Sequence, residues 1–288
     1  MKIAIVGSSG YIAKHLIKSF SSQIRDCEIV KIDMLGDVDI PLQLTAPADF
    51  EYDKLIGIDF IIFTAAISGP DLCANEFYKC WEINVTGTSF FIRETIKRGV
   101  KVLFFSSDAV FGDIPGRIYD EDSETHAYTA YGKMKKAIED EFKGNPLFKC
   151  IRLSYVASAN DKFITYCLNC IRNGETAEIF HPFYRNCTTV SDVIRAILWL
   201  LNNWSTFGSF VLDITGTELV SRIRMADELN RYLGCKLKYV VSQPDDFFFK
   251  NRPQITQMKS KYLYSLGIVE EQSFTEKFKE ELINIKPL

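Results

Sequence analysis

The sequence predicts an α/β fold with a doubly wound parallel sheet, and two features of its first half support this. Short, almost continuously apolar segments alternate with longer segments of helical periodicity, as in parallel sheets that helices cover on both faces. The connections between these segments are short, as such sheets require. The predicted strands are Lys2–Val6, Glu28–Ile32, Asp59–Thr64, Val100–Ser106 and Lys149–Leu153, and the predicted helices are Ile12–Ser22, Asn75–Arg98 and Ala130–Lys143, with a further short helix within Leu42–Leu55.

The regular alternation ends near residue 155. We therefore divide the chain into a first domain, 1–155, to which 187–216 returns, and a smaller α/β C-terminal lobe, 156–186 and 217–288. The elements expected in this half are helices at Phe163–Arg172, Ser191–Asn202 and Arg222–Leu233, a strand at Ser209–Ile214 and a last amphipathic helix near Thr275–Ile285.

Composition limits the classes of function. The 288 residues carry a net charge of -3, so we expect neither nucleic acid nor an anionic membrane surface as a partner. The N-terminal segment lacks the order of a signal peptide, and no apolar run is long enough for a membrane span, so we expect a cytoplasmic protein. The eight cysteines are scattered, and the one CxxC, Cys167–Cys170, falls in a predicted helix. We expect reduced thiols and no metal site.

A glycine-containing loop follows the first predicted strand and leads into a helix. Its spacing, GxxGxxA, departs from the GxGxxG pattern of dinucleotide sites, with Ala13 at the third position. Glycines allow the backbone to approach a pyrophosphate, and the helix N-terminus then presents N–H groups to that anion. A tight turn without a ligand is the alternative. The residues assigned to the cofactor here are Gly7, Ser9, Gly10, Tyr11 and Ile12.

Asp33 ends the second predicted strand, where an acidic residue can bind a ribose 2′-hydroxyl. The glycine loop and the two positions after Asp33 hold no Arg or Lys that would neutralise a 2′-phosphate. NAD is therefore the expected cofactor, with NADP as the alternative if Lys31 or a distant cation contributes. A solvated aspartate without a ligand is the structural alternative.

Tyr131 and Lys135 lie four residues apart on one face of a predicted helix. A neighbouring ammonium favours the phenolate, so we expect the pKa of Tyr131 to fall from its usual value of about 10. Such a tyrosine can exchange a proton with a substrate oxygen. The pair Tyr232 and Lys236 has the same spacing, but Gly234 lies between them. Ser107, at the carboxyl end of a predicted strand, distinguishes the first pair, because ligands bind at that edge of open sheets.

Together these residues resemble the extended short-chain dehydrogenases/reductases, and within them the dTDP-4-dehydrorhamnose reductases. The resemblance covers most of the chain and is strongest up to about residue 155. It implies a Rossmann-type dinucleotide-binding domain and a substrate-binding lobe, with Ser107, Tyr131 and Lys135 as catalytic residues and Tyr131 and Lys135 also at the cofactor. Further cofactor contacts implied by the resemblance are Asp39 and Ile40 beside the adenine, Thr64, Ala65 and Ala66 along the strand end, and Asn84.

Weaker similarities continue in the C-terminal half. Arg185-Asn186 and Arg252-Pro253 resemble segments that follow the substrate loop in this family. We assign substrate contacts to Ser107, Asp108, Arg185 and Arg252. Thr64 stands where Asn is common, and Ala109 stands where the reductases usually have an aromatic residue, which leaves the sugar open.

The residues after Ser107 favour one reaction within this family. Dehydratases carry Thr-Asp-Glu at this strand end, whereas this chain reads Ser107-Asp108-Ala109 and lacks the second carboxylate. We therefore expect an NAD(P)H-dependent reductase of a nucleotide-linked 4-keto-6-deoxy sugar, with Tyr131 as the proton donor. An NAD-dependent 4-epimerase and a catalytically silent sugar-nucleotide-binding subunit are the alternatives. A homodimer through the helices at Asn75–Arg98 and Ala130–Lys143 is a further expectation from the resemblance.

Overall fold

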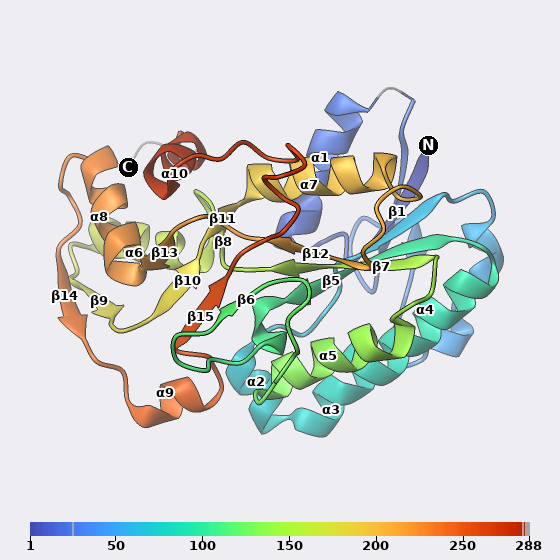
Figure 1. The fold of residues 1–288 in the computed structure, drawn as a ribbon, viewed down its shortest axis with the longest axis horizontal. Coiled ribbons are helices and arrows are strands. Elements are labelled where there is room, and N and C mark those ends of the chain that lie inside the picture. The colour runs from blue at the N-terminus through green and yellow to red at the C-terminus, as the bar shows by residue number, and fades with distance from the viewer. Residues whose placement is uncertain (25, 284, 286–288) are drawn as a thin grey trace. The chain divides into compact units, whose positions relative to one another are not determined.

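A computed structural model describes residues 1–24, 26–283 and 285 (Figure 1). The elements of the first half are β1 (Lys2–Val6), α1 (Tyr11–Gln23), β2 (Glu28–Asp33), β3 (Ile40–Pro41), the short 3₁₀-helices η1 (Pro47–Asp49) and η2 (Tyr52–Leu55), β4 (Phe60–Phe63), α2 (Pro70–Asn75), α3 (Phe77–Trp81), the π-helical η3 (Glu82–Gly87), α4 (Thr88–Lys97), β5 (Lys101–Ser107), η4 (Asp108–Val110), β6 (Ile118–Tyr119), α5 (Ala130–Phe142) and β7 (Phe148–Leu153). Those of the second half are β8 (Val156–Ala157), α6 (Lys162–Asn173), β9 (Ala177–Phe180), β10 (Tyr184–Asn186), β11 (Thr188–Thr189), α7 (Val190–Asn202), β12 (Val211–Ile214), β13 (Leu219–Ser221), α8 (Arg222–Tyr232), β14 (Tyr239–Ser242), α9 (Asp246–Lys250), β15 (Ile255–Met258) and α10 (Phe274–Leu282).

A seven-stranded sheet has the strand order β12-β7-β5-β4-β1-β2-β3. β1 is parallel to both of its neighbours, β2 and β4, and β4 is parallel to β5. The chain moves from β1 to β2 on one side and returns to β4 on the other, so the topological switch point lies between β1 and β4. The predicted Rossmann-type fold class is confirmed.

The chain forms two compact units. The first comprises Met1–Val110, Thr125–Arg152 and Leu198–Leu212, and the second comprises Phe111–Glu124, Leu153–Ile197 and Asp213–Leu288. The segment Phe111–Glu124 therefore groups with the second unit, which the sequence did not indicate. The assignment of a dinucleotide-binding domain and a substrate-binding lobe stays a prediction.

Helices cover both faces of the sheet in the first unit. α1 lies on one face, and α4 and α5 lie side by side on the other (Figure 1). The core between sheet and helices is apolar, because continuous runs of fully buried residues such as Phe60–Phe63 face helices on both sides. Phe91 of α4 and Ile138 of α5 are fully buried within it.

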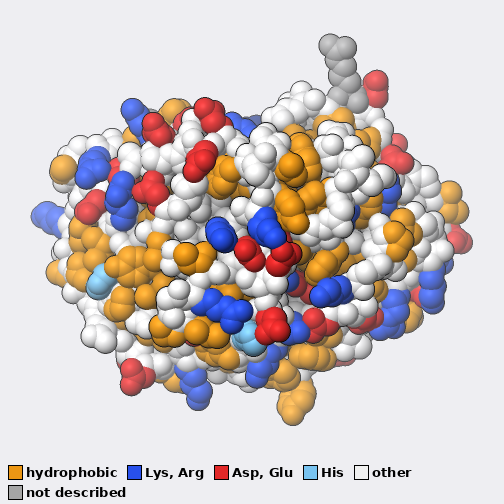
Figure 2. All heavy atoms as spheres, viewed as in Figure 1, with side chains coloured by type: hydrophobic (Ala, Val, Ile, Leu, Met, Phe, Trp, Pro, Cys, Tyr) orange, Lys and Arg blue, Asp and Glu red, His pale blue; other side chains and the backbone are white. Residues whose placement is uncertain are grey.

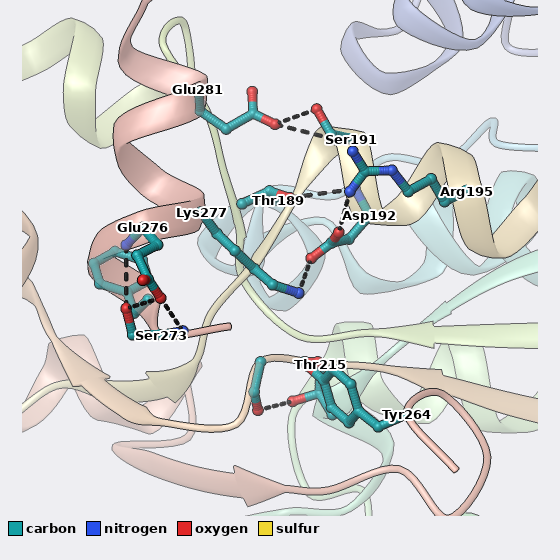
Figure 3. Close-up of polar contacts among 12 residues, drawn as sticks. Thr189, Ser191, Asp192, Arg195, Thr215, Tyr264, Ser273, Glu276, Lys277 and Glu281 are labelled. Carbon is teal, nitrogen blue, oxygen red and sulfur yellow. Dashed lines mark hydrogen bonds and ion pairs between the residues drawn. The ribbon is translucent and has the colours of Figure 1, made fainter. Parts of the chain in front are cut away.

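The second unit is built from short strands, the helices α6, α8, α9 and α10, and the first part of α7. A four-stranded sheet has the order β13-β10-β15-β6. Two further two-stranded sheets are formed by β11 with β8 and by β14 with β9. α6, α8 and α10 enclose a core that contains Cys167, Leu229 and Phe278. α10 also carries Lys277 and Glu281 toward the first turn of α7 (Figure 3).

Two predicted helices differ in detail from the observed ones. The helix expected at Asn75–Arg98 begins at Phe77, because Glu76, with a φ of -114° and a ψ of 47°, is not helical, and it then continues through α3, the π-helical η3 and α4 to Lys97. The widening ends at Gly87, where a Cβ would stand 1.8 Å from the Leu44 carbonyl oxygen. The short helix expected within Leu42–Leu55 is present as two 3₁₀-helices, η1 and η2.

The visible face carries acidic and basic side chains intermixed with apolar ones (Figure 2). This agrees with the small net charge of -3. In the part of the chain that the structure describes, no helix is both long enough and apolar enough to cross a membrane.

Candidate active site

Residues predicted to bind the dinucleotide lie at one edge of the seven-stranded sheet, together with the predicted catalytic serine. Gly7 follows β1, Asp33 ends β2, Thr64 follows β4 and Ser107 ends β5. These four strands are adjacent and parallel, so their carboxyl ends lie at the same edge. This edge, at the switch point, is where open α/β sheets bind ligands.

The turn after β1 requires glycine. Gly7 has a φ of +82°, and a Cβ there would stand 2.7 Å from the Ala65 amide nitrogen. The Gly7 amide donates to the Ile32 carbonyl at 2.9 Å, and the Gly10 amide donates to the Gly7 carbonyl at 2.9 Å. The backbone is thus bent tightly where a ligand can approach it.

The N-terminus of α1 is suited to an anion. Its N-cap residue, Gly10, provides no side chain, and among the described residues no side chain caps this end. The first turn also contains no acidic residue. Three residues of this 13-residue helix, Ala13, Leu16 and Phe20, anchor it in the core. The positive end of its dipole is therefore suited to a phosphate.

Asp33 lies at the predicted place and also organises the loop. One carboxylate oxygen accepts hydrogen bonds from the Ser9 amide at 2.9 Å and the Ser9 hydroxyl at 2.6 Å, and the other accepts one from the Met34 amide at 2.8 Å. Lys31 Nζ lies 2.5 Å from an Asp37 carboxylate oxygen. The lysine considered for a 2′-phosphate thus has a carboxylate partner.

Several residues that the resemblance assigned to the cofactor hold the protein backbone in place. The Asp39 carboxylate accepts from the Lys31 amide at 2.7 Å, and Ile40 is buried in β3. The Thr64 hydroxyl donates to the Val6 carbonyl at 2.8 Å. These contacts join β1, β2, β3 and the end of β4.

Asn84 has a similar role beside the end of β4. It lies in the π-helical turn η3, and its amide group accepts from the Ile67 amide at 2.8 Å and donates to the Ile67 carbonyl at 2.9 Å. The residue is 4% exposed. Asn84 therefore fixes the segment that continues from Ala65 and Ala66, so that segment keeps its place at the sheet edge.

α5 places Tyr131 and Lys135 beside the end of β5. Thr129 caps the helix by accepting from the Gly132 amide at 3.1 Å. A Cβ on Gly132 would stand 2.3 Å from the Ala109 carbonyl oxygen, so only glycine allows this helix turn to lie against η4. Tyr131 is consequently next to the segment that begins with Ser107.

Lys135 is buried in an apolar setting. It is 4% exposed, and its Nζ lies 4.5 Å from the Phe104 ring centre and 5.6 Å from that of Tyr131. Burial lowers the pKa of Lys135 to about 7, while Glu139, and Cys73 in its thiolate form, act in the opposite direction.

The expected fall in the tyrosine pKa was wrong for this structure. Burial raises the pKa of Tyr131 above its usual value, and the charges of Cys73 and Asp108 raise it further. Burial disfavours the charged form of both side chains, which is the phenolate of Tyr131 and the ammonium of Lys135. Because the pKa of Lys135 is itself lowered, its charge stabilises the Tyr131 phenolate less than an ordinary lysine would. Tyr131 is consequently a protonated group, suited to giving a proton.

Ser107 and Ser106 have different surroundings, and the difference favours Ser107. The Ser107 hydroxyl donates to Asp108 at 3.0 Å and accepts from the Ala109 amide at 3.2 Å, in a half-buried position at the strand end. The Ser106 hydroxyl is buried and bonded to Glu139. Ser107 is thus the serine at the sheet edge, as predicted.

The predicted substrate residues of the C-terminal half lie in the second unit. Arg185 donates to the carbonyls of Pro253 at 2.6 Å and Gln254 at 3.3 Å, so it lies against the segment that follows Arg252. The Arg252 guanidinium lies 4.4 Å from the Phe248 ring centre. The structure brings these two arginines to one region of the second unit, with Phe183 between Arg185 and the aromatic residues of α9.

Reasoning from the sequence missed three residues near the catalytic pair. Glu139 and Arg152 form an ion pair at 2.7 Å with both side chains buried, and Cys73 donates to the Ile67 carbonyl at 3.2 Å. Burial raises the pKa of Cys73 to about 12. The sequence contained one usable signal, since Glu139 continues the spacing of four from Tyr131 and Lys135.

A family model described as the RmlD substrate binding domain matches residues 1–286. Among curated proteins, the chain is similar to a dTDP-D-glucose 4,6-dehydratase of Mus musculus, 27% identical over 157 residues, which are 48% of this chain and 44% of the relative. It is also similar to a dTDP-4-dehydrorhamnose reductase of Sinorhizobium fredii, 28% identical over 162 residues, which are 55% of this chain and 51% of the relative. The chain thus spans about half the length of the curated relatives it matches.

A solved structure extends the similarity over the whole fold. It is a dTDP-4-dehydrorhamnose reductase from Bacillus anthracis in complex with NADP, with a TM-score of 0.82 and 21% identity, covering 98% of this chain and 97% of the other. At this identity the likeness establishes the fold.

Proposed function

Because the chain belongs to the RmlD substrate binding domain family and is an extended short-chain dehydrogenase/reductase, we propose that it reduces the 4-keto group of a nucleotide-linked 6-deoxy sugar with NAD(P)H. One observation carries the proposal. A tyrosine and a buried lysine on α5 lie beside a serine at the end of β5, at the same sheet edge as a glycine turn. A dinucleotide and a carbonyl compound bound at that edge would share one reaction centre.

The glycine turn and the uncapped end of α1 fit a dinucleotide. Gly7, Gly10 and the first turn of α1 would hold the pyrophosphate, and Asp33 would face the adenosine ribose. Asp33 and the Lys31–Asp37 pair favour NAD over NADP, because a 2′-phosphate would meet carboxylates. Bound NAD(P)H would supply the hydride that the C4 carbon receives.

The side chains around the carbonyl would handle its proton. Tyr131 is protonated at neutral pH and would donate its hydroxyl proton to the C4 oxygen as that oxygen becomes an alcohol. The Ser107 hydroxyl would donate a hydrogen bond to the same oxygen. Lys135, when charged, would stabilise the tyrosinate left behind and hold the nicotinamide ribose. Asp108, Arg185 and Arg252 are the proposed substrate contacts.

Ala109 supports reduction over dehydration. Elimination of water needs a second acid/base carboxylate after the strand end, and the residue at that position here is a buried alanine pressed against Gly132. The match to a dehydratase therefore does not carry its reaction to this chain. The 4-epimerase alternative uses the same tyrosine and lysine, and a silent binding subunit would need neither.

The test is NAD(P)H oxidation with 4-keto sugar nucleotides carrying UDP, GDP, CDP and dTDP. We expect Tyr131→Phe to lower turnover by a factor of about 10² to 10⁴, the usual contribution of a general acid, with nearly unchanged NADH affinity. Tyr232→Phe, the other tyrosine with this spacing, is the matched control and should keep full activity. Full activity of Tyr131→Phe would refute the mechanism. Tight dinucleotide binding without oxidation by any substrate would favour the silent subunit, and interconversion of 4-epimers with retained NAD would favour the epimerase.

A homodimer stays a prediction. The region proposed for it contains Tyr78 on α3, which is 88% exposed, beside the partly buried Phe77 and Trp81. An exposed tyrosine of this size next to apolar rings is typical of interface positions.

A further inference from the structure

Glu139 lies at the centre of a buried hydrogen-bonded cluster behind the candidate active site. The residue is 2% exposed, and its carboxylate accepts from Arg152 Nη2 at 2.7 Å and from Arg152 Nε at 3.1 Å and 3.2 Å. The Ser106 hydroxyl donates to the same carboxylate. Three elements, α5, β7 and β5, are thus joined through one side chain.

The cluster is placed so that it can act on the reacting groups. Glu139 follows Lys135 by one helix turn, as Lys135 follows Tyr131, so all three share one side of α5. Ser106 immediately precedes Ser107. A movement of Glu139 would therefore change the positions of the tyrosine, the lysine and the serine together.

We propose that Glu139, held by Arg152 and Ser106, is a positioning residue that keeps the buried Lys135 side chain charged and holds the end of β5 against α5. This inference rests on the proposed function for its catalytic consequence only. Glu139 touches neither the substrate nor the reacting atoms in this assignment and acts through its neighbours.

The groups around Lys135 explain why Glu139 is needed. Among the described residues, Lys135 has no carboxylate within ion-pair distance, and its Nζ faces the Phe104 and Tyr131 rings. The charges that favour its protonated form are Glu139 on its own helix and Cys73 from α2. Burial raises the pKa of Cys73 to about 12, so that thiol is neutral at physiological pH and Glu139 is the remaining anion.

Arg152 is the direct ion-pair partner of Glu139. Its guanidinium contacts the carboxylate through both Nε and Nη2, with Nη2 at 2.7 Å, so the buried carboxylate has its cation in place. Removing the negative charge of Glu139 would leave the Arg152 cation in place and take away the carboxylate that favours the protonated form of Lys135. The pKa of Lys135 should then fall below its present value of about 7.

A ¹³C NMR titration of lysine Cε resonances tests the inference without any need for turnover. The Lys135 resonance is assigned by its absence in Lys135→Met. In the wild-type protein we expect a midpoint near pH 7, and in Glu139→Gln a midpoint at least one pH unit lower. Asp192→Asn, which removes a carboxylate from a buried ion pair in the second unit, is the matched control and should leave the Lys135 midpoint unchanged. An unchanged midpoint in Glu139→Gln would overturn the proposal.

The pH profile of kcat/KM is the second readout. If charged Lys135 is required, kcat/KM falls as the pH rises through the pKa of Lys135. Glu139→Gln should move this decrease in kcat/KM to lower pH. With a midpoint one pH unit lower, the variant should lose about ninefold at pH 8 but only about twofold at pH 6, whereas a purely structural defect would lower activity equally at both.

A replacement variant and a comparison of the two readouts distinguish failure of this inference from failure of the proposed function. If Glu139→Gln does not fold, the double variant Glu139→Gln/Arg152→Gln, which leaves no uncompensated charge, takes its place. If the titration shifts as expected but no 4-keto sugar nucleotide is reduced, the proposed function fails while the link between Glu139 and Lys135 stands.

Discussion

Two of the buried lysines, Lys135 in the first unit and Lys277 in the second, differ in what surrounds their ammonium groups. Their exposed fractions are 4% and 7%. Lys277 on α10 places its Nζ 2.5 Å from Asp192 on α7, as Figure 3 shows, and Asp192 also accepts from Arg195 at 3.1 Å. Lys135 has aromatic rings around its Nζ and, within the described chain, no ion-pair partner.

The difference separates a structural lysine from a functional one. A buried cation with a direct carboxylate partner is fixed in charge and position, and it links two helices. A buried cation without such a partner has a lowered pKa and can change its charge near neutral pH, which is typical of catalytic groups. The partner that Lys135 lacks at short range is supplied at a distance, by Glu139.

The largest expected effect comes from breaking the Lys277 pair. Asp192→Asn leaves a buried ammonium without an anion, and the free energy of unfolding should fall by about 3–5 kcal/mol. Urea denaturation measures the change. The double variant Asp192→Asn/Lys277→Met should recover at least half of the loss, and kcat/KM of the folded single variant should stay within twofold of wild type. A large activity loss at unchanged stability would reverse the roles assigned to the two lysines.

The sequence could predict the parts of the site that depend on periodicity and strand ends. Gly7, Asp33, Ser107 and Tyr131 follow apolar runs or lie on an amphipathic helix, so their meeting at one sheet edge follows from the topology alone. The strands of the second unit could not be predicted in this way. β10, for example, has only three residues, and the alternation pattern needs at least four.

The electrostatics of the site could not be read from spacing. Tyr131 and Lys135 at positions i and i+4 indicate proximity, and proximity suggested that the lysine lowers the tyrosine pKa. The direction depends on burial, which Phe104 and the closely packed η4 determine, and these are tertiary contacts. Glu139 was readable as a third residue at the same spacing, but its partner Arg152 comes from β7, which only the fold brings near.

A change in stability of opposite sign is expected when Lys135 is removed. The pKa of Lys135 is lowered to about 7, whereas an unfolded lysine titrates near 10.4, so between these values the unfolded chain binds more protons. Stability therefore rises with pH across this window, by up to about 1.4 kcal/mol per pH unit. Lys135→Met removes the penalty and should be more stable than wild type by a few kcal/mol at pH 7, with the gain shrinking toward pH 9.

Thermal or urea unfolding of both proteins at pH 7, 8 and 9 measures this gain. Lys133→Met changes an exposed lysine two residues earlier on α5, and its stability relative to wild type should not vary with pH. If the advantage of Lys135→Met were constant from pH 7 to 9, the variant would be gaining from packing, and Lys135 would be neutral or paired throughout.

The smallest effect should come from the second cation on Asp192. The Arg195 side chain is 54% exposed, against 8% for Lys277, although both contact the same carboxylate. Water already solvates the guanidinium, so Arg195→Ala should lower the free energy of unfolding by only about 0.2–1 kcal/mol, and less at high salt. A loss of stability close to that of Asp192→Asn would mean that the Arg195–Asp192 ion pair, and not the buried Lys277–Asp192 ion pair, supplies most of the stabilisation. The difference between Lys277 and Lys135 would then depend on how many cations share one carboxylate, because Asp192 contacts both Lys277 and Arg195.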